Sequence, residues 1–149
     1  MIGREVWSAK SSLNCRRLDR TVPNSNRLPL EGEKLLIIED EILIALDLEA
    51  TLLDAGAENV ELFTTHREAV AKFDGDKYTA AVLDIRVGLE TTYDIALRLD
   101  EGNIPFIFCS GQELSEEMRA RLPDTILLRK PVLPGDLIQG LVQAINRRP

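Results

Sequence analysis

Short apolar runs alternate along this chain with longer stretches in which apolar residues recur every three or four positions. Short runs rich in Leu, Ile and Val are typical of strands that are buried on both faces of a parallel sheet. We expect such strands at 34–39, 59–63, 79–84, 104–109 and 125–129. The periodic stretches predict amphipathic helices at 41–55, 64–73, 92–101, 115–122 and 134–146.

Strands that alternate with helices predict an α/β fold with right-handed crossovers and helices on both faces of the sheet. We expect a doubly wound, five-stranded parallel sheet in the order 2-1-3-4-5, with strands one and three side by side at its centre. The segment 85–91 is predicted to be a loop. The helix caps that we expect are Gly56, Thr64 or Thr65 with Glu68, and Ser115.

Charge is unevenly distributed along the chain. Residues 1–30 contain six basic and two acidic side chains, a net charge of +4, so the rest of the chain carries −11 of the total of −7. The segment 1–33 is polar and basic and has no regular period, which predicts a leader ahead of one domain at 34–149. Its composition favours a mobile tail over a docking arm. The acidic body argues against a nucleic-acid binder, because it repels a phosphate backbone.

Neither the cysteines nor the apolar segments point to export. Cys15 lies in the leader and Cys109 in a predicted strand, so we expect no disulfide and a reducing compartment. No apolar stretch approaches the ~20 residues of a membrane span. The N-terminus also lacks the apolar core of a signal peptide. We therefore expect a cytoplasmic protein without a membrane partner.

Polar residues stand at the ends of four of the five predicted strands. Because the carboxyl ends of parallel strands meet at one edge of the sheet, we expect Glu39, Asp40, Asp84, Ser110 and Lys130 to share a pocket. The three carboxylates would repel one another without a cation, and a hard divalent ion such as Mg²⁺ removes that repulsion. The alternative interpretation of Glu39 and Asp40 is a pair of acids at a helix N-terminus.

Asp84 is also a candidate nucleophile, because a carboxylate can accept a phosphoryl group as an aspartyl phosphate. A metal would neutralise the incoming oxygens. The Ser110 hydroxyl could donate to a phosphoryl oxygen, and Lys130 could pair first with the carboxylates and then with the phosphoryl group. Taken singly, these residues are also ordinary turn, loop and surface residues. The sequence leaves the isomer of the Lys130–Pro131 bond open.

The motifs IIEDE, VLDI, FCSG and LRKP occur in this order, with spacings of 44, 26 and 20 residues between Asp40, Asp84, Ser110 and Lys130. Together they resemble the receiver domain of two-component response regulators, roughly over 34–147. The resemblance implies a flavodoxin-like receiver fold in which a sensor histidine kinase or histidine phosphotransfer protein passes a phosphoryl group to Asp84. It also implies Mg²⁺ bound by Glu39, Asp40, Asp84 and the backbone carbonyl of Arg86. Ser110 then corresponds to the switch hydroxyl and Lys130 to the pocket lysine.

A closer likeness is to single-domain receivers of alphaproteobacteria, through IALDLE, Gly88 with Tyr93, and IPFIFCSG. Few residues follow the last predicted helix, so we expect a phosphoprotein without an output domain that signals by protein–protein contact. The resemblance places that contact on the face of the fourth helix, fifth strand and fifth helix. Whether the chain forms a homodimer stays open.

The sequence departs from the family pattern where phosphorylation is usually coupled to that face. Leu127 stands where receivers usually carry an aromatic residue, and Gln112 and Glu113 replace another aromatic expected after the switch serine. Coupling must then use another route, such as rearrangement of the loop 110–114. By family analogy, Arg86 borders the pocket, where it could form a salt bridge with an acid and block it.

Three other functions remain to be weighed. An aspartate-nucleophile phosphohydrolase needs a second Asp two residues after the nucleophile, where this chain has Arg86, so we expect no enzyme. A pseudo-receiver or adaptor would bind partners without phosphotransfer. A flavin carrier shares the predicted fold, but the acids at 39–41 would repel its phosphate.

Overall fold

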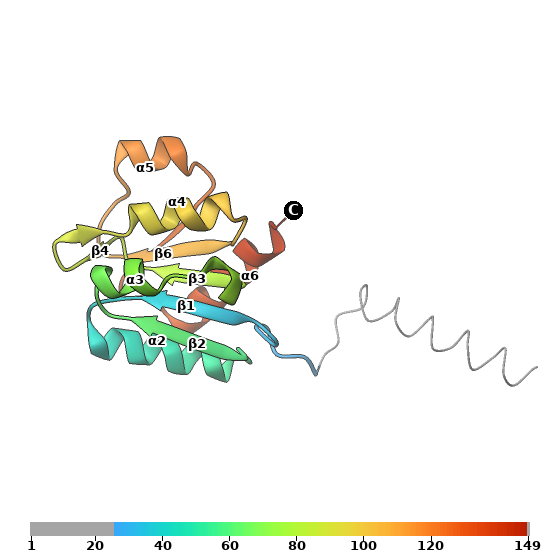
Figure 1. The fold of residues 1–149 in the computed structure, drawn as a ribbon. Coiled ribbons are helices and arrows are strands. Elements are labelled where there is room, and N and C mark those ends of the chain that lie inside the picture. Colours follow the sequence, from blue (N-terminus) through green and yellow to red (C-terminus); the bar gives the residue numbers. More distant parts are fainter. Residues whose placement is uncertain (1–25, 149) are drawn as a thin grey trace, which may run out of the picture.

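Five parallel strands form the central sheet of the computed structural model, which describes residues 26–148 (Figure 1). They are β1 (Lys34–Ile38), β2 (Asn59–Phe63), β3 (Ala80–Leu83), β6 (Phe106–Ser110) and β7 (Ile126–Arg129). Their order is β2-β1-β3-β6-β7, and every neighbouring pair is parallel. This confirms the predicted doubly wound order, with the first and third strands of the sheet at the switch point.

Helices cover both faces of the sheet (Figure 1). On one face lie α2 (Ile42–Asp54) and α6 (Pro134–Asn146); on the other lie α3 (His66–Lys72), α4 (Tyr93–Glu101) and α5 (Glu116–Arg121). A short 3-10 turn, η1 (Gly75–Lys77), precedes β3. In β1, Leu35 and Ile37 pack into the layer of α2 and α6, whereas Leu36 and Ile38 pack into the other layer. All four are fully buried, which explains why the strands are continuous apolar runs.

The segment 85–91, which we predicted to be a loop, is a hairpin. Its strands are β4 (Arg86–Val87) and β5 (Glu90–Thr91), which pair antiparallel as a separate two-stranded sheet. Gly88 begins the two-residue connection with a φ of +63°, a backbone conformation that glycine adopts without strain. Strands of two residues are too short for a hydrophobic period to reveal them.

The predicted caps of two helices are confirmed. Thr65 accepts a hydrogen bond from the Glu68 amide at the start of α3, and Ser115 accepts one from the Met118 amide at the start of α5. Gly56 follows α2 with a φ of +106°, and a Cβ there would lie 2.7 Å from the Cβ of Leu28. The close approach shows that the chain before β1 packs against the end of α2.

Residues just before β1 belong to the folded unit. Leu30 is fully buried in the layer of α2 and α6, and its amide donates to the Ala55 carbonyl at 2.9 Å. Glu33 lies 3.6 Å from the Arg148 guanidinium near the other end of the chain. The leader predicted over 1–33 to be mobile is therefore anchored at its end, and its residues 1–25 lie outside the described residues. Between residues 26 and 148, no helix is long and apolar enough to span a membrane.

Tyr78 connects the start of β3 to β2. Its side chain is buried, and its hydroxyl donates to the carboxylate of Glu61. Burial and the neighbouring Glu61 carboxylate hold the pKa of Tyr78 well above its usual value. The folded state therefore favours the neutral phenol.

We expect Tyr78→Phe to lower the free energy of unfolding by about 1–2 kcal/mol at pH 7, because Glu61 loses its hydrogen-bond donor. The difference from wild type should shrink above about pH 10, where the unfolded tyrosine ionises but the folded one does not. Urea unfolding at pH 7 and at alkaline pH measures both effects. Tyr93→Phe is the control: its buried hydroxyl has no partner within the described residues, so stability should be unchanged or slightly raised. A pH-independent difference for Tyr78→Phe would contradict the expectation.

Candidate functional site

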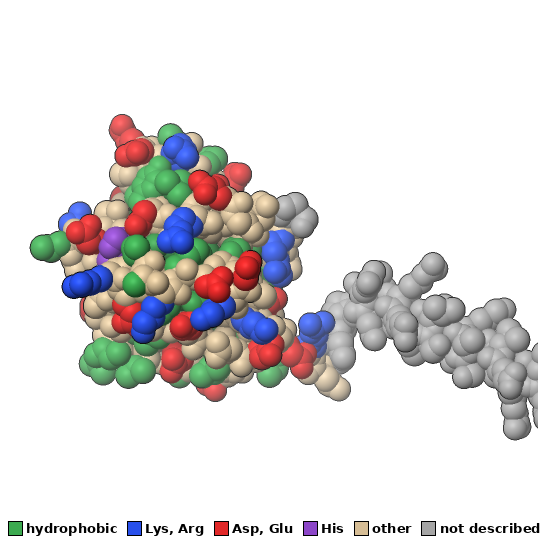
Figure 2. Space-filling model, viewed as in Figure 1, with side chains coloured by type: hydrophobic (Ala, Val, Ile, Leu, Met, Phe, Trp, Pro, Cys, Tyr) green, Lys and Arg blue, Asp and Glu red, His purple; other side chains and the backbone are tan. Residues whose placement is uncertain are grey.

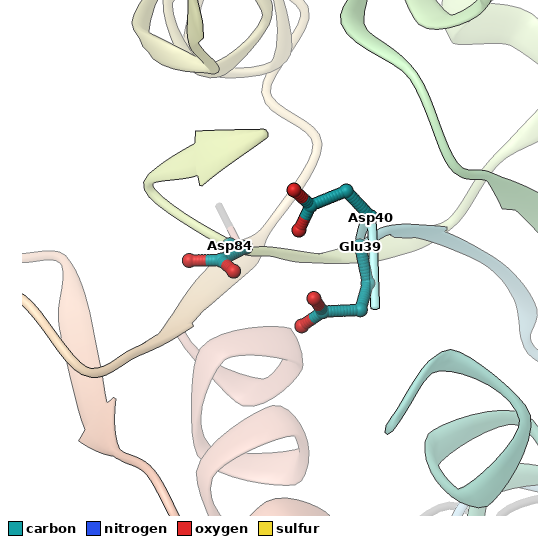
Figure 3. A group of neighbouring side chains, drawn as sticks. All are labelled: Glu39, Asp40 and Asp84. Carbon is teal, nitrogen blue, oxygen red and sulfur yellow. The ribbon is translucent and has the colours of Figure 1, made fainter. Parts of the chain in front are cut away.

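Three carboxylates meet at the carboxyl ends of β1 and β3. Oxygen atoms of Glu39, Asp40 and Asp84 all lie within 4.8 Å of one another. Figure 3 shows the side chains of Glu39 and Asp40 extending from the end of β1 toward Asp84 at the end of β3. Glu39 and Asp84 are buried, with exposures of 1% and 8%, whereas Asp40 is exposed. The cluster predicted from the sequence is thus brought together at the switch point of the sheet.

Lys130 supplies the positive charge in this cluster. Its Nζ lies 2.6 Å from Oε2 of Glu39 and 2.9 Å from Oδ2 of Asp84. It follows β7, and the Lys130–Pro131 bond is cis, the isomer that the sequence had left open. Two carboxylates so close together could not both stay ionised out of water without such a partner.

Burial and hydrogen bonding together shift the pKa values of Glu39 and Lys130. Burial raises the pKa of Glu39, even though hydrogen bonds from Lys130 and the Glu41 amide favour the ionised form. Burial alone would lower the pKa of Lys130, but its hydrogen bonds to Glu39 and Asp84 outweigh that effect and raise it. Lys130 is therefore a permanent positive charge at neutral pH.

Backbone amides orient two of the acids. The Glu41 amide donates to Oε1 of Glu39 at 3.1 Å, and the Gly88 amide donates to Oδ2 of Asp40 at 2.9 Å. Glu41 is the N-cap of α2, so the alternative of acids at a helix N-terminus describes part of the role of Glu39. It does not explain Asp40, whose carboxylate is held by the hairpin on the far side of the site.

Ser110 lies at the same edge of the sheet but is bonded within its own loop. It ends β6 and is 1% exposed. Its hydroxyl accepts from the Gln112 amide at 3.2 Å, and its carbonyl accepts from the Lys130 amide at 3.1 Å. The serine is thus joined to the pocket lysine through the backbone, and a hydroxyl that accepts one hydrogen bond can still donate another.

Arg86 does not block the site. It lies in β4, its side chain is exposed, and between residues 26 and 148 it forms no salt bridge with the three acids. Where an aromatic was expected, Glu113 pairs with Arg119 of α5 at 2.7 Å and with Arg129 of β7. Leu127 is half-buried against the core. An ion-pair cluster therefore lies on the face where, as noted from the sequence, the aromatic residues usual in receivers are missing.

Neither the cavity beside the site nor the charged surface suggests a different function. A cavity of about 520 Å³ lies between α2 and the segment 130–132 and reaches Cys109, but burial raises the pKa of that thiol to about 12. Cys109 is therefore a neutral thiol and a poor nucleophile. On the face shown in Figure 2, basic and acidic side chains are interspersed rather than gathered into a basic patch.

Thr92 is a site residue that the sequence analysis missed. It is fully buried, and its hydroxyl donates to the backbone carbonyl of Asp84 at 2.7 Å. From sequence alone, a Thr at this position would be assigned to helix capping. Only the tertiary structure shows that its hydroxyl turns toward Asp84.

Solved structures that resemble this chain over about four fifths of its length include receiver domains. A response regulator receiver protein from Sinorhizobium medicae is 29% identical over 80% of this chain and 99% of its own, with a TM-score of 0.66. The signal receiver domain of a modulated diguanylate cyclase from Desulfovibrio desulfuricans is 28% identical over 79% of this chain and 97% of its own, with a TM-score of 0.67. A CheY-like receiver domain protein from Methanospirillum hungatei, 20% identical over 79% and 97%, has a TM-score of 0.69 and shows the fold alone.

No family model and no curated protein matches the sequence. The structural likeness nevertheless covers nearly all of these receiver domains, and the first of them comes from Sinorhizobium, in keeping with the alphaproteobacterial likeness. The resemblance inferred from the four motifs is confirmed. The chain thus has the CheY-like, flavodoxin-like fold of response-regulator receiver domains and resembles those domains over about four fifths of its length.

Proposed function

We propose that this chain is a phosphoacceptor in a two-component phosphorelay. In this proposal Asp84 takes a phosphoryl group from a sensor histidine kinase or a histidine phosphotransfer protein. The observation that carries it is the bridging of Glu39 and Asp84 by Lys130, at 2.6 and 2.9 Å, beside a third carboxylate at the switch point of the sheet. This arrangement provides a carboxylate nucleophile, a place for a divalent cation and a fixed ammonium for the phosphoryl oxygens.

The donor atoms fit Mg²⁺. Three carboxylates and one ammonium give the cluster a formal charge of −2, and hard oxygen ligands are those that Mg²⁺ prefers. Glu39, Asp40 and Asp84 would hold the ion, with the backbone carbonyl of Arg86 as a further ligand by family resemblance. When bound, Mg²⁺ offsets the negative charge of the incoming phosphoryl oxygens.

The proposed transfer exchanges one bond to phosphorus for another. A carboxylate oxygen of Asp84 forms the new O–P bond while the N–P bond of the donor phosphohistidine breaks. The imidazole leaves with the electron pair of that bond, and it leaves neutral because its other ring nitrogen carries a proton. Lys130, already held by Asp84, is positioned to pair with the transferred group, and the Ser110 hydroxyl, which accepts from the Gln112 amide, has its own proton to donate to it.

We infer a switch or carrier rather than a phosphohydrolase. Arg86 stands two residues after Asp84, where such hydrolases place an acid–base aspartate. The complete set of Glu39, Asp40, Asp84 and Lys130 also supports phosphotransfer over a pseudo-receiver. We place the activity in the cytoplasm and the downstream contact, with a protein partner, on the face of α5, β7 and α6. On that face the ion pairs of Glu113 would take the place of the usual aromatic residue.

Mg²⁺ together with beryllium fluoride, a phosphoryl mimic, should raise the melting temperature by on the order of 5 °C, because it binds only the folded site. Asp84→Asn should lose most of this shift, whereas Asp100→Asn, an exposed acid on α4, should keep it. Thermal melts monitored by circular dichroism give the comparison. An absent shift in the native chain, or an equal one in Asp84→Asn, would count against the proposal.

Removing Lys130 should destabilise the metal-free protein, and Mg²⁺ should restore part of the lost stability. We expect Lys130→Met to lower the free energy of unfolding by about 3 kcal/mol without metal, since Glu39 and Asp84 lose their buried partner. Saturating Mg²⁺ should narrow this gap. The exposed Lys77→Met should change stability by less than about 0.5 kcal/mol in both conditions. If the stability difference between wild type and Lys130→Met is the same with and without Mg²⁺, the ion and the ammonium do not share a site.

The chain should take up about one phosphoryl group per molecule from acetyl phosphate and should not turn over a phosphate ester. Intact-mass spectrometry measures the first, and release of phosphate from p-nitrophenyl phosphate measures the second. If Asp84→Asn still incorporates the phosphoryl group, the acceptor is another residue. Sustained ester hydrolysis would favour an enzyme, and no incorporation at all would favour a pseudo-receiver.

A further inference from the structure

The beginning of α4 departs from the local rule for helix caps. Thr92 is its N-cap residue, yet its side chain makes no capping hydrogen bond. In the same chain, the N-cap hydroxyls of Thr65 and Ser115 both accept from the amide three residues on. Thr92 has the same chemical means to cap its helix, so another requirement has turned its hydroxyl away.

The Thr92 hydroxyl is instead bonded to the main chain of Asp84, the proposed phosphoacceptor. The Thr92 hydroxyl donates to the Asp84 carbonyl at 2.7 Å, and the Thr92 amide donates to the Ile85 carbonyl at 2.9 Å. Thr92 is fully buried and Asp84 is 8% exposed, so water has little access to replace the bond. A carbonyl without a partner in such a place is costly, which makes the bond a strong constraint on the main chain at Asp84.

A second tie holds the other end of the same hairpin. Thr92 closes the base of the segment 85–91, and at the turn the Gly88 amide donates to Oδ2 of Asp40 at 2.9 Å. The hairpin is thus fastened to both acids of the switch point. Arg86, whose carbonyl faces the metal in the proposed function, lies on the strand between these two ties.

We propose that Thr92 is a positioning residue for the phosphoacceptor site, a role that rests on the proposed function. Its hydroxyl fixes the Asp84 main chain and the base of the β4–β5 hairpin. It thereby sets where the Asp84 carboxylate and the Arg86 carbonyl lie relative to Asp40. Groups that orient the ligands of a metal commonly change its affinity by about 10- to 100-fold when they are removed.

The test uses variants that separate the hydroxyl from the shape of the side chain. Thr92→Val keeps the shape of the side chain and removes the donor; Thr92→Ser keeps the donor. We expect Thr92→Val to bind Mg²⁺ about tenfold more weakly by isothermal titration calorimetry, and Thr92→Ser to stay within about twofold of wild type. Thr91→Val, an exposed neighbour on β5, is the matched control and should not change the affinity.

A second measurement does not depend on metal or phosphate. In the metal-free protein, hydrogen exchange of the Gly88 and Thr92 amides should be faster in Thr92→Val than in Thr92→Ser, because the hairpin loses its tie at the base. If Thr92→Val does not fold, the pair Thr92→Ser and Thr92→Ala, which also differ by one hydroxyl, gives the same comparison.

The outcomes separate this inference from the function on which it rests. Wild type that takes up phosphate from acetyl phosphate in Mg²⁺, together with weakened Mg²⁺ binding in Thr92→Val and rescue in Thr92→Ser, supports both. Wild-type uptake with unchanged Mg²⁺ binding in Thr92→Val overturns the positioning role and leaves the proposed function intact, even if the variant melts earlier. Wild type that neither binds Mg²⁺ nor takes up phosphate overturns both.

Discussion

The site depends on one ammonium held between two buried carboxylates. Glu39 and Asp84 lie at the ends of adjacent strands, where parallel topology forces their side chains together. Lys130 reaches them from β7, two strands away from β3, and makes that proximity tolerable. Its two short contacts join Glu39, Asp84 and Lys130 into one unit.

The cluster of Glu39, Asp40, Asp84 and Lys130 keeps a net negative charge. One ammonium cannot neutralise three carboxylates. Asp40 is the most exposed of the three, and within residues 26–148 its carboxylate is bonded only to the Gly88 amide. The cluster is therefore stable enough to fold and still electrostatically unsatisfied. A binding site of this kind gains more from a divalent cation than a fully paired one would.

Much of this arrangement could be predicted from sequence, and for a physical reason. The apolar runs of β1, β3 and β6 are buried on both faces, so polar residues mark where these strands end. The strand 59–63 and the helix 134–146 match their observed bounds. The acids and Lys130 were predicted together because a parallel sheet brings its strand ends to one edge. The hairpin at 86–91 was missed because two-residue strands carry no period. The direction of the Thr92 hydroxyl was missed because only the packing of α4 against β3 decides it.

Both ends of the described chain lie near each other, away from the carboxylates. Glu33, just before β1, is paired with Arg148, just after α6, and Leu30 seals the adjoining layer of the core. The acids, by contrast, lie where β1 and β3 finish (Figures 1 and 3). A fluorophore, an affinity handle or a surface tether attached at the start or the end of the described segment would therefore leave the acidic edge accessible to large binding partners. For the same reason, a peptide that joins residue 27 to residue 148, and so keeps Leu30, makes circular permutation of this domain geometrically simple.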